Sequence, residues 1–588
     1  MNSLWNTDTK RPIDKSVPDL SVFKLPITYL DKKHPLPHSL NQDLELSTTT
    51  PTNEEDERKP MYDILLTPSN AFSQKILPFW SEYFTSDTDF LKDTQKIIKQ
   101  TNAPNSFSGK PLNTDSVIET WNMFKRDNHF LETYSFIEWK AFAELNKSST
   151  FLQLLSVLHI TSPVLSLLIP ILFMIFPFIL LKIQRVPITF SNYINILKNI
   201  AKYHFIGKSI QQMSSFSFDK LFYFFITLGL YLLQIYQNID SCLRFQRNIK
   251  RMHLALTNMN GFITGSIQNM TSFVASAKQY TTYQPFCKDI EGHAATLTKL
   301  RTMLSNLPPL ENLFVQVSQN GYRLRCMYEI YENKQLEQSL LYAMGFNGYM
   351  DHLYNINTQI TKQALSFASF TKKSTKFVKQ FYPPHHGEER VTNNGDLEKN
   401  IVISSPNKSG KTTFLKTTTL NILFSQQFGC GFYKNAHINP YTHIHTYLNI
   451  PDTSSRDSLF QAESRRCKEM IDVITTHLPE DNYRHFCVFD ELYSGTNPEE
   501  ATKAGLAFID YLAGFPHVEF ILTTHYFKIC STIKKHPCVQ NYKMDVLVDE
   551  KGEFNYTYKL KKGISRLKGG IRVLRDLQYP EEILQRLK

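Results

Sequence analysis

A short polar loop between an apolar run and a helix start is the first feature of the sequence with a clear chemical meaning. The run Ile401-Val-Ile-Ser404 is typical of a buried strand, and Ser405-Pro-Asn-Lys-Ser-Gly-Lys-Thr-Thr413 follows it directly. Backbone N–H groups of such a loop and of the helix N-terminus bind phosphate oxygens. We expect Lys411 to reach the β- and γ-phosphates of a nucleotide and Thr412 to bind Mg²⁺. The strict pattern has Gly where this chain has Ser405, so the loop alone leaves a chance match open. The residues predicted to bind the nucleotide are Ser405, Pro406, Asn407, Lys408, Ser409, Gly410, Lys411, Thr412 and Thr413.

Two later apolar runs also end in polar side chains. Phe486-Cys-Val-Phe489 precedes Asp490 and Glu491, and Ile521-Leu-Thr-Thr524 precedes His525. Asp490 fits binding of Mg²⁺, Glu491 fits polarisation of the attacking water, and His525 is placed to sense the γ-phosphate. Taken alone, an acidic pair after a strand is usually a surface pair, and a single histidine is usually structural. Three strands that end in this order predict a site for ATP and Mg²⁺. Its predicted catalytic residues are Lys411, Glu491 and His525, and its predicted metal ligands are Thr412 and Asp490.

The elements that must position these residues lie in the C-terminal third of the chain. After Tyr382-Pro-Pro384, short apolar runs alternate with helical stretches. This alternation predicts an α/β domain over 380–588, with a parallel sheet and crossover helices.

The motifs of this domain resemble the ATPase domain of the MutS mismatch-repair family. They are SPNKSGKTTFLK, DSLFQAE, FDELYSGTNPEEA and TTHY. Tyr382-Pro383 and Val391-Thr-Asn-Asn394 resemble the segment that packs near the adenine in this family. Residues 554–563 resemble the closing strand of the family and its Lys-x-Gly turn. The resemblance covers about a third of the chain.

The resemblance implies an ABC-type mechanism in which ATP binds between two subunits. Ser458 aligns with the signature serine of the family, although a helix N-cap is the alternative role. Ser494-Gly-Thr496 would be the loop that crosses the dimer interface. A transporter or a chromosome-cohesion ATPase fits less well because LSGGQ is absent from the sequence. The resemblance therefore implies a partner that is a second copy or a related MutS-like subunit, with DNA as a further partner.

Two uncharged segments predict a membrane region over 148–240. Asp, Glu, Lys and Arg are absent from 148–181, which contains the apolar segment 164–181, and a second such segment covers 221–239. About 20 apolar residues suffice to span a bilayer. The alternative is a pair of buried helices in a large soluble domain. Six basic residues and one acidic residue in the connector 182–220 oppose a luminal position for it, and a re-entrant first segment would leave it on the cytosolic side.

The remaining sequence predicts helical organisation. We expect a flexible polar leader over 1–60, a small helical domain over 61–147 and a helical, lever-like domain over 241–379. The predicted fold class is therefore multidomain, with mostly α-helical N-terminal and middle regions and a C-terminal α/β P-loop ATPase domain. A Phe-x-Glu motif of the kind that senses mismatches in this family was not found before residue 150.

Composition sets wide limits on function. The 588 residues carry a net charge of +11, and residues 534–588 hold 13 Lys and Arg against 7 Asp and Glu. Such a basic tract suits DNA or anionic lipid, or simply a solvated surface. The eight cysteines lack zinc-like spacing, and a structural role is the favoured one for His437, His443 and His445. With no signal-peptide pattern visible, we expect membrane localisation with the ATPase domain facing the cytosol.

The sequence thus predicts a membrane-attached, dimeric, MutS-like ATPase that acts on mismatched or branched DNA. One alternative is a membrane-associated scaffold or remodelling ATPase that has lost DNA recognition. The other is a soluble DNA-repair protein whose apolar runs are core.

Overall fold

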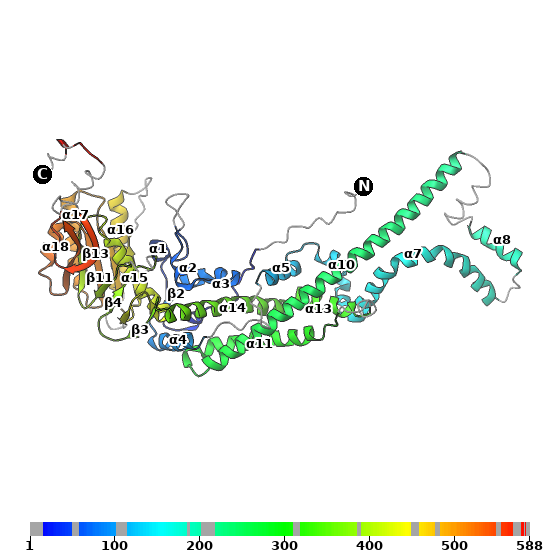
Figure 1. The fold of residues 1–588 in the computed structure, drawn as a ribbon, viewed down its shortest axis with the longest axis horizontal. Helices are drawn as coiled ribbons and strands as arrows, with labels where there is room; N and C mark the ends of the chain where they lie inside the picture. Colours follow the sequence, from blue (N-terminus) through cyan, green and yellow to red (C-terminus); the bar gives the residue numbers. More distant parts are fainter. Residues whose placement is uncertain are drawn as a thin grey trace. The chain divides into compact units, whose positions relative to one another are not determined.

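The chain forms two compact units that interleave along the sequence. The computed structural model describes residues 16–49, 58–101, 114–184, 189–201, 218–309, 318–384, 390–448, 458–476, 483–548, 554–567, 578–580 and 582–583. Unit 1 comprises Met1–Pro18, Phe107–Ile267 and Ala295–Leu340, and unit 2 comprises Asp19–Ser106, Gln268–Ala294 and Leu341–Lys588. The protein is multidomain and mostly helical, as the sequence predicts (Figure 1). The sheets of unit 2 are mixed, whereas the sequence predicts a parallel sheet.

Unit 1 is built from helices. Those that lie within it are α5 (Thr114–Lys125), α6 (Phe130–Thr133), the 3-10 helix η3 (Lys140–Lys147), α7 (Ser149–Ile183), α8 (Phe190–Ala201) and α13 (Asn320–Glu332). Three longer helices continue from one unit into the other: α10 (Phe218–Ala277), α11 (Gln284–Ser305) and α14 (Lys334–Thr361).

The apolar segments of unit 1 lie in two of these helices. The segment 164–181 belongs to α7 and 221–239 belongs to α10. By length and hydropathy, one helical stretch among the described residues could cross a membrane, Ser149–Leu168, and 17% of that window is buried. This window overlaps the first predicted segment at 164–168, and among the residues searched the second predicted segment, 221–239, does not meet the criterion.

The centre of unit 2 is a six-stranded sheet in the order β13-β12-β6-β11-β10-β9. Its strands are β6 (Asn400–Ser404), β9 (His443–Tyr447), β10 (His485–Asp490), β11 (Val518–Thr524), β12 (Val539–Val548) and β13 (Phe554–Lys562). Neighbouring strands are parallel except β12 and β13. The strands predicted from apolar runs are therefore β6, β10 and β11, and each of the three is almost wholly buried.

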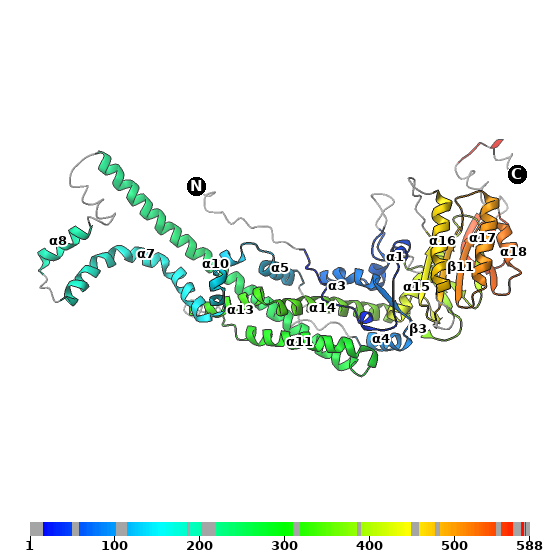
Figure 2. The same ribbon diagram turned by 180° about the vertical axis from the view of Figure 1, so that it is seen from behind.

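Helices cover the six-stranded sheet and supply its core. They are α15 (Lys411–Phe428), α16 (Leu459–Thr476), α17 (Pro498–Ala513) and α18 (Phe527–Ile533), and Figure 2 shows them from behind. Met470, Ile509 and Ile529 from α16, α17 and α18 share one buried cluster with Val402 and Leu522 of the strands. This core fixes the strand ends that carry the predicted site.

A smaller, five-stranded sheet lies in the same unit. Its order is β5-β4-β8-β3-β7, and its strands are β3 (Ser366–Phe370), β4 (Lys376–Gln380), β5 (Asn393–Asp396), β7 (Cys430–Gly431) and β8 (Asn435–Ile438). The predicted helical domain over 241–379 therefore ends in two strands, and the two units divide that range between them.

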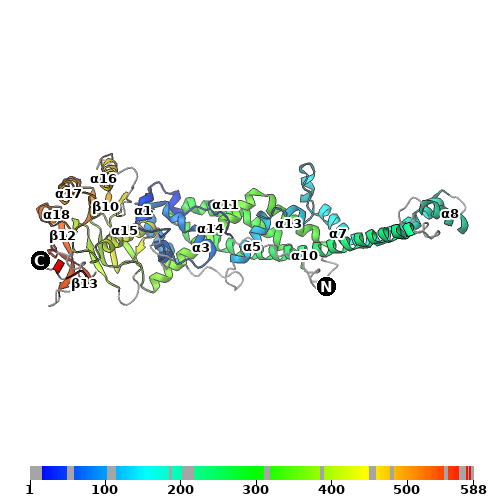
Figure 3. The same ribbon diagram turned by 90° about the horizontal axis from the view of Figure 1, so that it is seen from above.

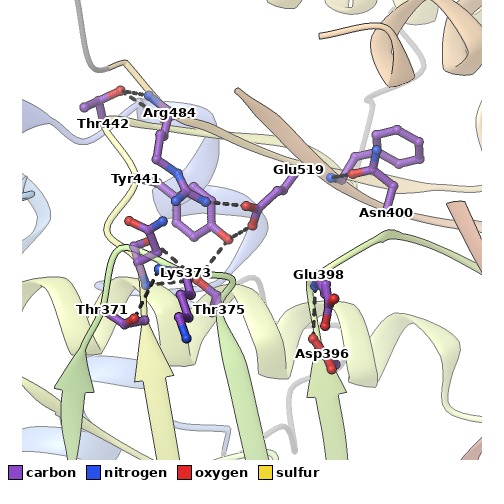
Figure 4. A network of polar contacts seen from close by, with 12 residues as sticks. Thr371, Lys373, Thr375, Asp396, Glu398, Asn400, Tyr441, Thr442, Arg484 and Glu519 are labelled. Carbon is purple, nitrogen blue, oxygen red and sulfur yellow. Dashed lines mark hydrogen bonds and ion pairs between the residues drawn. The ribbon is translucent and has the colours of Figure 1, made fainter. Parts of the chain in front are cut away.

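A buried polar network connects the two sheets where β10 and β11 begin (Figure 4). The Tyr441 hydroxyl contacts Glu519 and lies 3.1 Å from Oγ1 of Thr375, which precedes β4. Arg484 pairs with the other oxygen of Glu519, and its guanidinium lies 5.0 Å from the centre of the Tyr441 ring. Burial raises the pKa of Glu519, and Arg484 opposes that shift. A buried carboxylate with these partners fixes the end of the sheet opposite the predicted site.

Much of the predicted leader is folded, and its Phe23 packs against Phe286 of α11 and Tyr342 of α14. Residues 19–49 hold the 3-10 helix η1 (Pro26–Tyr29), β1 (Lys33–Pro35) and α1 (His38–Asp43), and Leu20, Phe23, Leu25 and Ile27 are buried. The segment 1–60 is polar in its overall composition, so these widely spaced apolar residues did not indicate a folded segment. The predicted leader also includes 1–15 and 50–57, which lie outside the described residues.

The next segment of unit 2 contacts the C-terminal end of α15. It contains α2 (Met61–Leu66), α3 (Ala71–Ile76), η2 (Leu77–Ser81), β2 (Tyr83–Thr85, paired with β1) and α4 (Thr88–Gln100). Gln427 donates from Nε2 to the carbonyls of Trp80 (2.6 Å) and Tyr83 (2.9 Å), and Gln426 donates to that of Thr85 (2.9 Å). The predicted small domain over 61–147 is thus divided, because 61–101 joins unit 2 and 114–147 joins unit 1.

Candidate nucleotide-binding site

The loop between β6 and α15 has the tight conformation that its sequence predicts. Lys408 and Gly410 have positive φ angles of 64° and 93°. At Gly410 a side chain would be strained, and its Cβ would lie 3.1 Å from Cδ1 of Tyr558. Successive backbone turns of this kind, at the start of a helix, make a cradle for an anion.

Lys411 is buried at the start of α15 and has three oxygen partners. Its Nζ lies 3.0 Å from the carbonyl oxygen of Ser405, 3.4 Å from Oδ1 of Asn407 and 3.0 Å from Oε1 of Glu491. Its side chain is 5% exposed. The loop therefore holds its cation toward the strand-end carboxylate.

Strand pairing brings the next two polar groups together. Asp490 is the register partner of Thr523 in the parallel pair β10 and β11. The Thr412 hydroxyl donates to Oδ2 of Asp490 at 2.7 Å, and the Thr523 hydroxyl contacts Oδ1. Hard oxygen donors suit Mg²⁺, which needs one or two protein ligands when phosphate and water complete its shell. Among the described residues, there is no group of three His, Cys, Asp or Glu that could hold a metal alone.

Glu491 occupies a constrained turn after β10. Its φ is 54°, and Tyr493 two residues later has a φ of 58°, both unusual for residues with side chains. Nδ1 of His525 lies 3.5 Å from Oε1 of Glu491. The contact with His525 and the charge of Lys411 lower the pKa of the Glu491 carboxyl to about 2. The group is thus a carboxylate throughout the physiological range.

A cavity of about 670 Å³ opens over these residues. Oγ of Ser409 is buried there, and the described residues offer it no hydrogen-bond partner. A phosphate oxygen is the kind of group that would satisfy such a hydroxyl. The cavity is lined by Gln380, Phe381, Tyr382, Val391, Asn393, Asn407, Lys408, Ser409, Gly410, Lys411, Thr412, Thr413, Phe414, Thr417, Asp490, Glu491 and Tyr558.

The far wall of the cavity comes from the five-stranded sheet and β13. Asn393 connects them, because its Nδ2 donates to the carbonyl of Tyr558 at 2.9 Å and its Oδ1 accepts from the backbone N–H of Leu560 at 2.8 Å. Arg390 lies 4.2 Å from the ring centre of Phe381. Aromatic walls of this kind suit a flat heterocycle.

Helix α16 contacts the loop after Glu491. Ser458 is exposed and caps this helix: its Oγ accepts from the backbone N–H of Gln461 at 3.3 Å. Glu463, 2% exposed, accepts at Oε1 from the backbone N–H and hydroxyl of Ser494 at 3.0 and 3.1 Å, and at Oε2 from the N–H of Gly495 at 3.2 Å. A Cβ on Gly495 would lie 2.6 Å from Cγ of Leu459. The loop after Glu491 therefore packs so closely against the first turn of α16 that a side chain at position 495 would clash with Leu459.

The structure gathers most of the predicted site residues around one cavity. The cavity is lined by Asn407 to Thr413, Asp490 and Glu491. Ser405 and Pro406 belong to the same loop but are not lining residues. His525 does not line the cavity either, but it contacts Glu491, which does. Ser458 is not among the lining residues and has the N-cap geometry that the sequence left as the alternative.

Sequence reasoning missed two features of this region. The cavity wall includes Gln380, which lies in no motif, and Phe414 and Tyr558, which lie in the motif SPNKSGKTTFLK and in the segment 554–563 but were not predicted to bind the nucleotide. Glu463 lies inside the DSLFQAE motif, four residues after Leu459 on one face of α16, and its spacing was the available signal.

A comparison with protein families finds a match for the region that contains the loop and the strand-end acids. Residues 401–588 match the family model described as MutS domain V. The C-terminal part of the chain is similar to MutS domain V, and we refer to residues 401–588 by that label. It contains the loop, the strand-end acids and β13, whereas the cavity walls from β4 and β5 precede the matched range.

Curated relatives agree with this assignment. The DNA mismatch repair protein MutS of Persephonella marina is 28% identical over 213 residues, which are 36% of this chain and 23% of the relative. That of Leuconostoc mesenteroides is 25% identical over 199 residues (33% and 23%). That of Staphylococcus haemolyticus is 21% identical over 378 residues (63% and 37%), so the similarity extends upstream of MutS domain V. The chain aligns with less than two-fifths of the length of each of these relatives.

Proposed function

We propose that the protein binds and hydrolyses ATP with Mg²⁺ at the cavity in its MutS domain V. The observation that carries this proposal is the position of Lys411, buried between the loop carbonyl of Ser405 and the carboxylate of Glu491 at the cavity wall. A buried ammonium group beside a tight helix-start loop is suited to phosphate.

Each polar group around the cavity has a chemical role in this proposal. Lys411 and the loop N–H groups bind the phosphates, and Thr412 and Asp490 would hold Mg²⁺, which neutralises developing phosphate charge when bound. Glu491 orients the attacking water, and His525 keeps that carboxylate in place from the neighbouring strand end. Phe381, Tyr382 and Val391 are the wall for the base.

A dimer is the assembly that MutS family resemblance favours. Ser458 is exposed at the start of α16, so its hydroxyl is available to a nucleotide held by a second subunit. The contacts of Glu463 with Ser494 and Gly495 would link this signature position to the loop at the interface. The partner is a second copy or a related MutS-like subunit.

DNA is proposed as a partner through the relatives, which are named DNA mismatch repair proteins. The basic tract 534–588, with 13 Lys and Arg against 7 Asp and Glu, has the charge that phosphates need. The second candidate is a membrane scaffold or remodelling ATPase without DNA recognition. The exposed apolar residues of α7 and α10 favour membrane attachment in both cases, with MutS domain V on the cytosolic side.

ATP hydrolysis by the purified full chain tests the proposal. We expect Mg²⁺-dependent release of phosphate that Lys411→Ala and Glu491→Gln both abolish. Hydrolysis at the parental rate in both variants would show that the chemistry lies elsewhere. A shift of mismatched against homoduplex DNA, at several salt concentrations, separates the DNA-binding protein from the scaffold.

A further inference from the structure

In unit 1, α7 and α10 are connected by hydrogen bonds between polar groups. The Tyr231 hydroxyl donates to the carbonyl of Ser166 at 3.1 Å, and Nδ2 of Asn238 donates to Oγ of Ser166 at 3.1 Å. Nearer the helical body, Sγ of Cys242 lies 3.5 Å from the carbonyl oxygen of Ile160. Three side chains of α10 therefore donate hydrogen bonds to the antiparallel helix α7, two of them to backbone carbonyls and one to the Ser166 hydroxyl.

The outward side chains of the same helices are apolar. Phe176 of α7 and Phe225 and Leu230 of α10 are each 61% exposed. Further exposed apolar residues are Val164, Leu165, Leu167, Leu168, Ile175, Ile179 and Ile183 on α7, and Phe222, Ile226, Leu228, Leu232, Leu233, Tyr236 and Ile239 on α10. Polar contacts inside and apolar side chains outside are the reverse of a water-soluble helix pair.

The apolar region begins where α7 leaves the helical body of unit 1. Its first turns pack on α13, where Ser156 Oγ lies 3.0 Å from Asn320 Nδ2 and Gln153 accepts from the N–H of Gly321 at 2.9 Å. α7 and α10 extend away from α5 and α13, and α8 lies near their far end (Figure 3). Residues 160–183 give about 36 Å of helix, which exceeds the bilayer core of about 30 Å.

A band of cations follows the apolar part of α10. This basic band consists of Arg244, Arg247, Lys250 and Arg251, all exposed. The spacing of three and four residues places the four on one face of the helix, opposite the buried Phe245, Ile249 and Met252. Asp240 pairs with Arg244 at 3.1 Å and is the nearest acidic residue on this helix. The four band residues and Asp240 together carry a formal charge of +3.

We propose that α7 and α10 form a lipid-embedded hairpin whose basic band binds anionic lipid headgroups at the membrane surface. The inference deepens the membrane attachment included in the proposed function. A lipid bilayer matches both the apolar residues and the basic band. Its hydrocarbon core suits the exposed apolar residues, and its phosphate oxygens suit the cations that lie one to three helical turns beyond them. Nucleic acid would match the basic band alone.

The proposal also orients the hairpin. Both helices join the helical body at the level of the basic band, so the chain enters and leaves the lipid through the same leaflet. Anionic lipids concentrate in the cytoplasmic leaflet, and basic residues flank spans on that side. This places the helical body of unit 1 on the cytosolic side, and a re-entrant hairpin is the form that also leaves the basic connector 182–220 on that side.

Flotation of the full chain with phosphatidylcholine vesicles, with and without phosphatidylglycerol, tests this inference. We expect flotation with both, tighter binding to the anionic vesicles, and loss of that preference by at least about tenfold when all four band residues are changed to Gln. A matched control changes four exposed lysines of unit 2 to Gln, namely Lys372, Lys399, Lys503 and Lys528, and should keep the preference. A chain that stays at the bottom of the gradient without detergent would overturn the hairpin. A band variant that keeps its lipid preference but loses duplex DNA would overturn the headgroup assignment.

A second variant tests the hairpin itself. Phe225→Lys with Leu232→Lys puts two charges on the exposed apolar face, and we expect carbonate to extract this variant while the parent stays in the membrane. Unchanged helix content by circular dichroism excludes unfolding as the cause. ATP hydrolysis in the same preparations reports on MutS domain V alone, so failure of one proposal is distinguishable from failure of the other.

Discussion

Nζ of Lys411 lies 3.0 Å from Oε1 of Glu491, so the cation of the phosphate loop and the strand-end carboxylate neutralise each other. A nucleotide phosphate that enters the cavity competes with Glu491 for this ammonium group. Binding of ATP would therefore release the carboxylate toward water at the same time as it recruits the lysine. The Lys411–Glu491 contact would therefore couple ATP binding to the release of Glu491, so that binding precedes hydrolysis.

Glu491→Gln should separate these two steps. The amide still accepts from Lys411 but is a poor water-polarising group, so we expect the hydrolysis rate to fall by about 10² to 10⁴ while ATP binding persists. ATP should then hold the chain as a stable dimer in size-exclusion chromatography. Glu499→Gln, a change in the exposed first turn of α17, is the control and should leave both properties as in the parent. A Glu491→Gln chain that hydrolyses ATP normally would remove Glu491 from the mechanism.

Thr412 should control the requirement for magnesium. Its hydroxyl donates to Asp490 at 2.7 Å, so the Thr412→Ala change removes one oxygen ligand and leaves Asp490 less well positioned. We expect the Mg²⁺ concentration for half-maximal hydrolysis to rise by about tenfold or more. Thr412→Ser keeps the hydroxyl and should restore the parental Mg²⁺ dependence. An equal effect of both substitutions would show that packing of the threonine methyl, and not its hydroxyl, matters.

Glu463 should be a determinant of stability in MutS domain V. Its buried carboxylate accepts from the N–H groups of Ser494 and Gly495 and from the Ser494 hydroxyl. Glu463→Ala leaves these donors buried without partners, so we expect the free energy of unfolding to fall by about 2 to 4 kcal/mol. Thermal unfolding of the variant measures this loss. The exposed Glu469→Ala on the same helix is the comparison, and an equal melting temperature for both variants would contradict the assigned role.

Two buried histidines should make the fold sensitive to mild acid. Burial lowers the pKa of His352 to about 4 and, with the nearby charges of His443 and Arg466, that of His445 to about 3. The unfolded chain takes up these protons near pH 6.5, so stability is complete above that pH and falls as the pH drops toward the folded pKa values. Between pH 7 and pH 5 we expect a loss on the order of 1–2 kcal/mol for each histidine.

The pH dependence can be assigned with single variants. His445→Gln should flatten the decline of the melting temperature between pH 7 and pH 5, whereas the exposed His437→Gln should not. The low pKa of Glu491, about 2, places its own titration below this range. A melting temperature that is constant from pH 7 to pH 5 in the parent would contradict the buried, neutral state of both histidines.

Local pattern was enough to predict the strands and the loop that carry the candidate site. An apolar run, a tight loop and Gly410-Lys411-Thr412 specify β6, the phosphate loop and the start of α15, because each part depends on neighbours in sequence. Asp490 and Glu491 follow a wholly buried strand, and parallel pairing then fixes them beside the loop. The MutS resemblance identified the same residues through their order along the chain.

Contacts between distant segments could not be predicted in this way. The polar composition of 1–60 concealed Phe23, whose ring contacts Tyr342 and Phe286, because burial there depends on helices hundreds of residues away. Gln427 contacts the carbonyl of Trp80 for the same reason, although nothing in either local sequence indicates it. Glu463 lies in the DSLFQAE motif, but its contacts with Ser494 and Gly495 depend on how α16 packs against the loop after Glu491.

Equilibrium binding of ATP to the full chain and to Lys411→Ala tests the central claim most directly. Removing the buried ammonium group should weaken ATP binding by at least about 100-fold, since a charge-assisted contact of this kind contributes several kcal/mol. Lys416→Ala, on the same helix and outside the cavity lining, should bind ATP as the parent does. Equal affinity of the parent and Lys411→Ala for ATP would contradict the account.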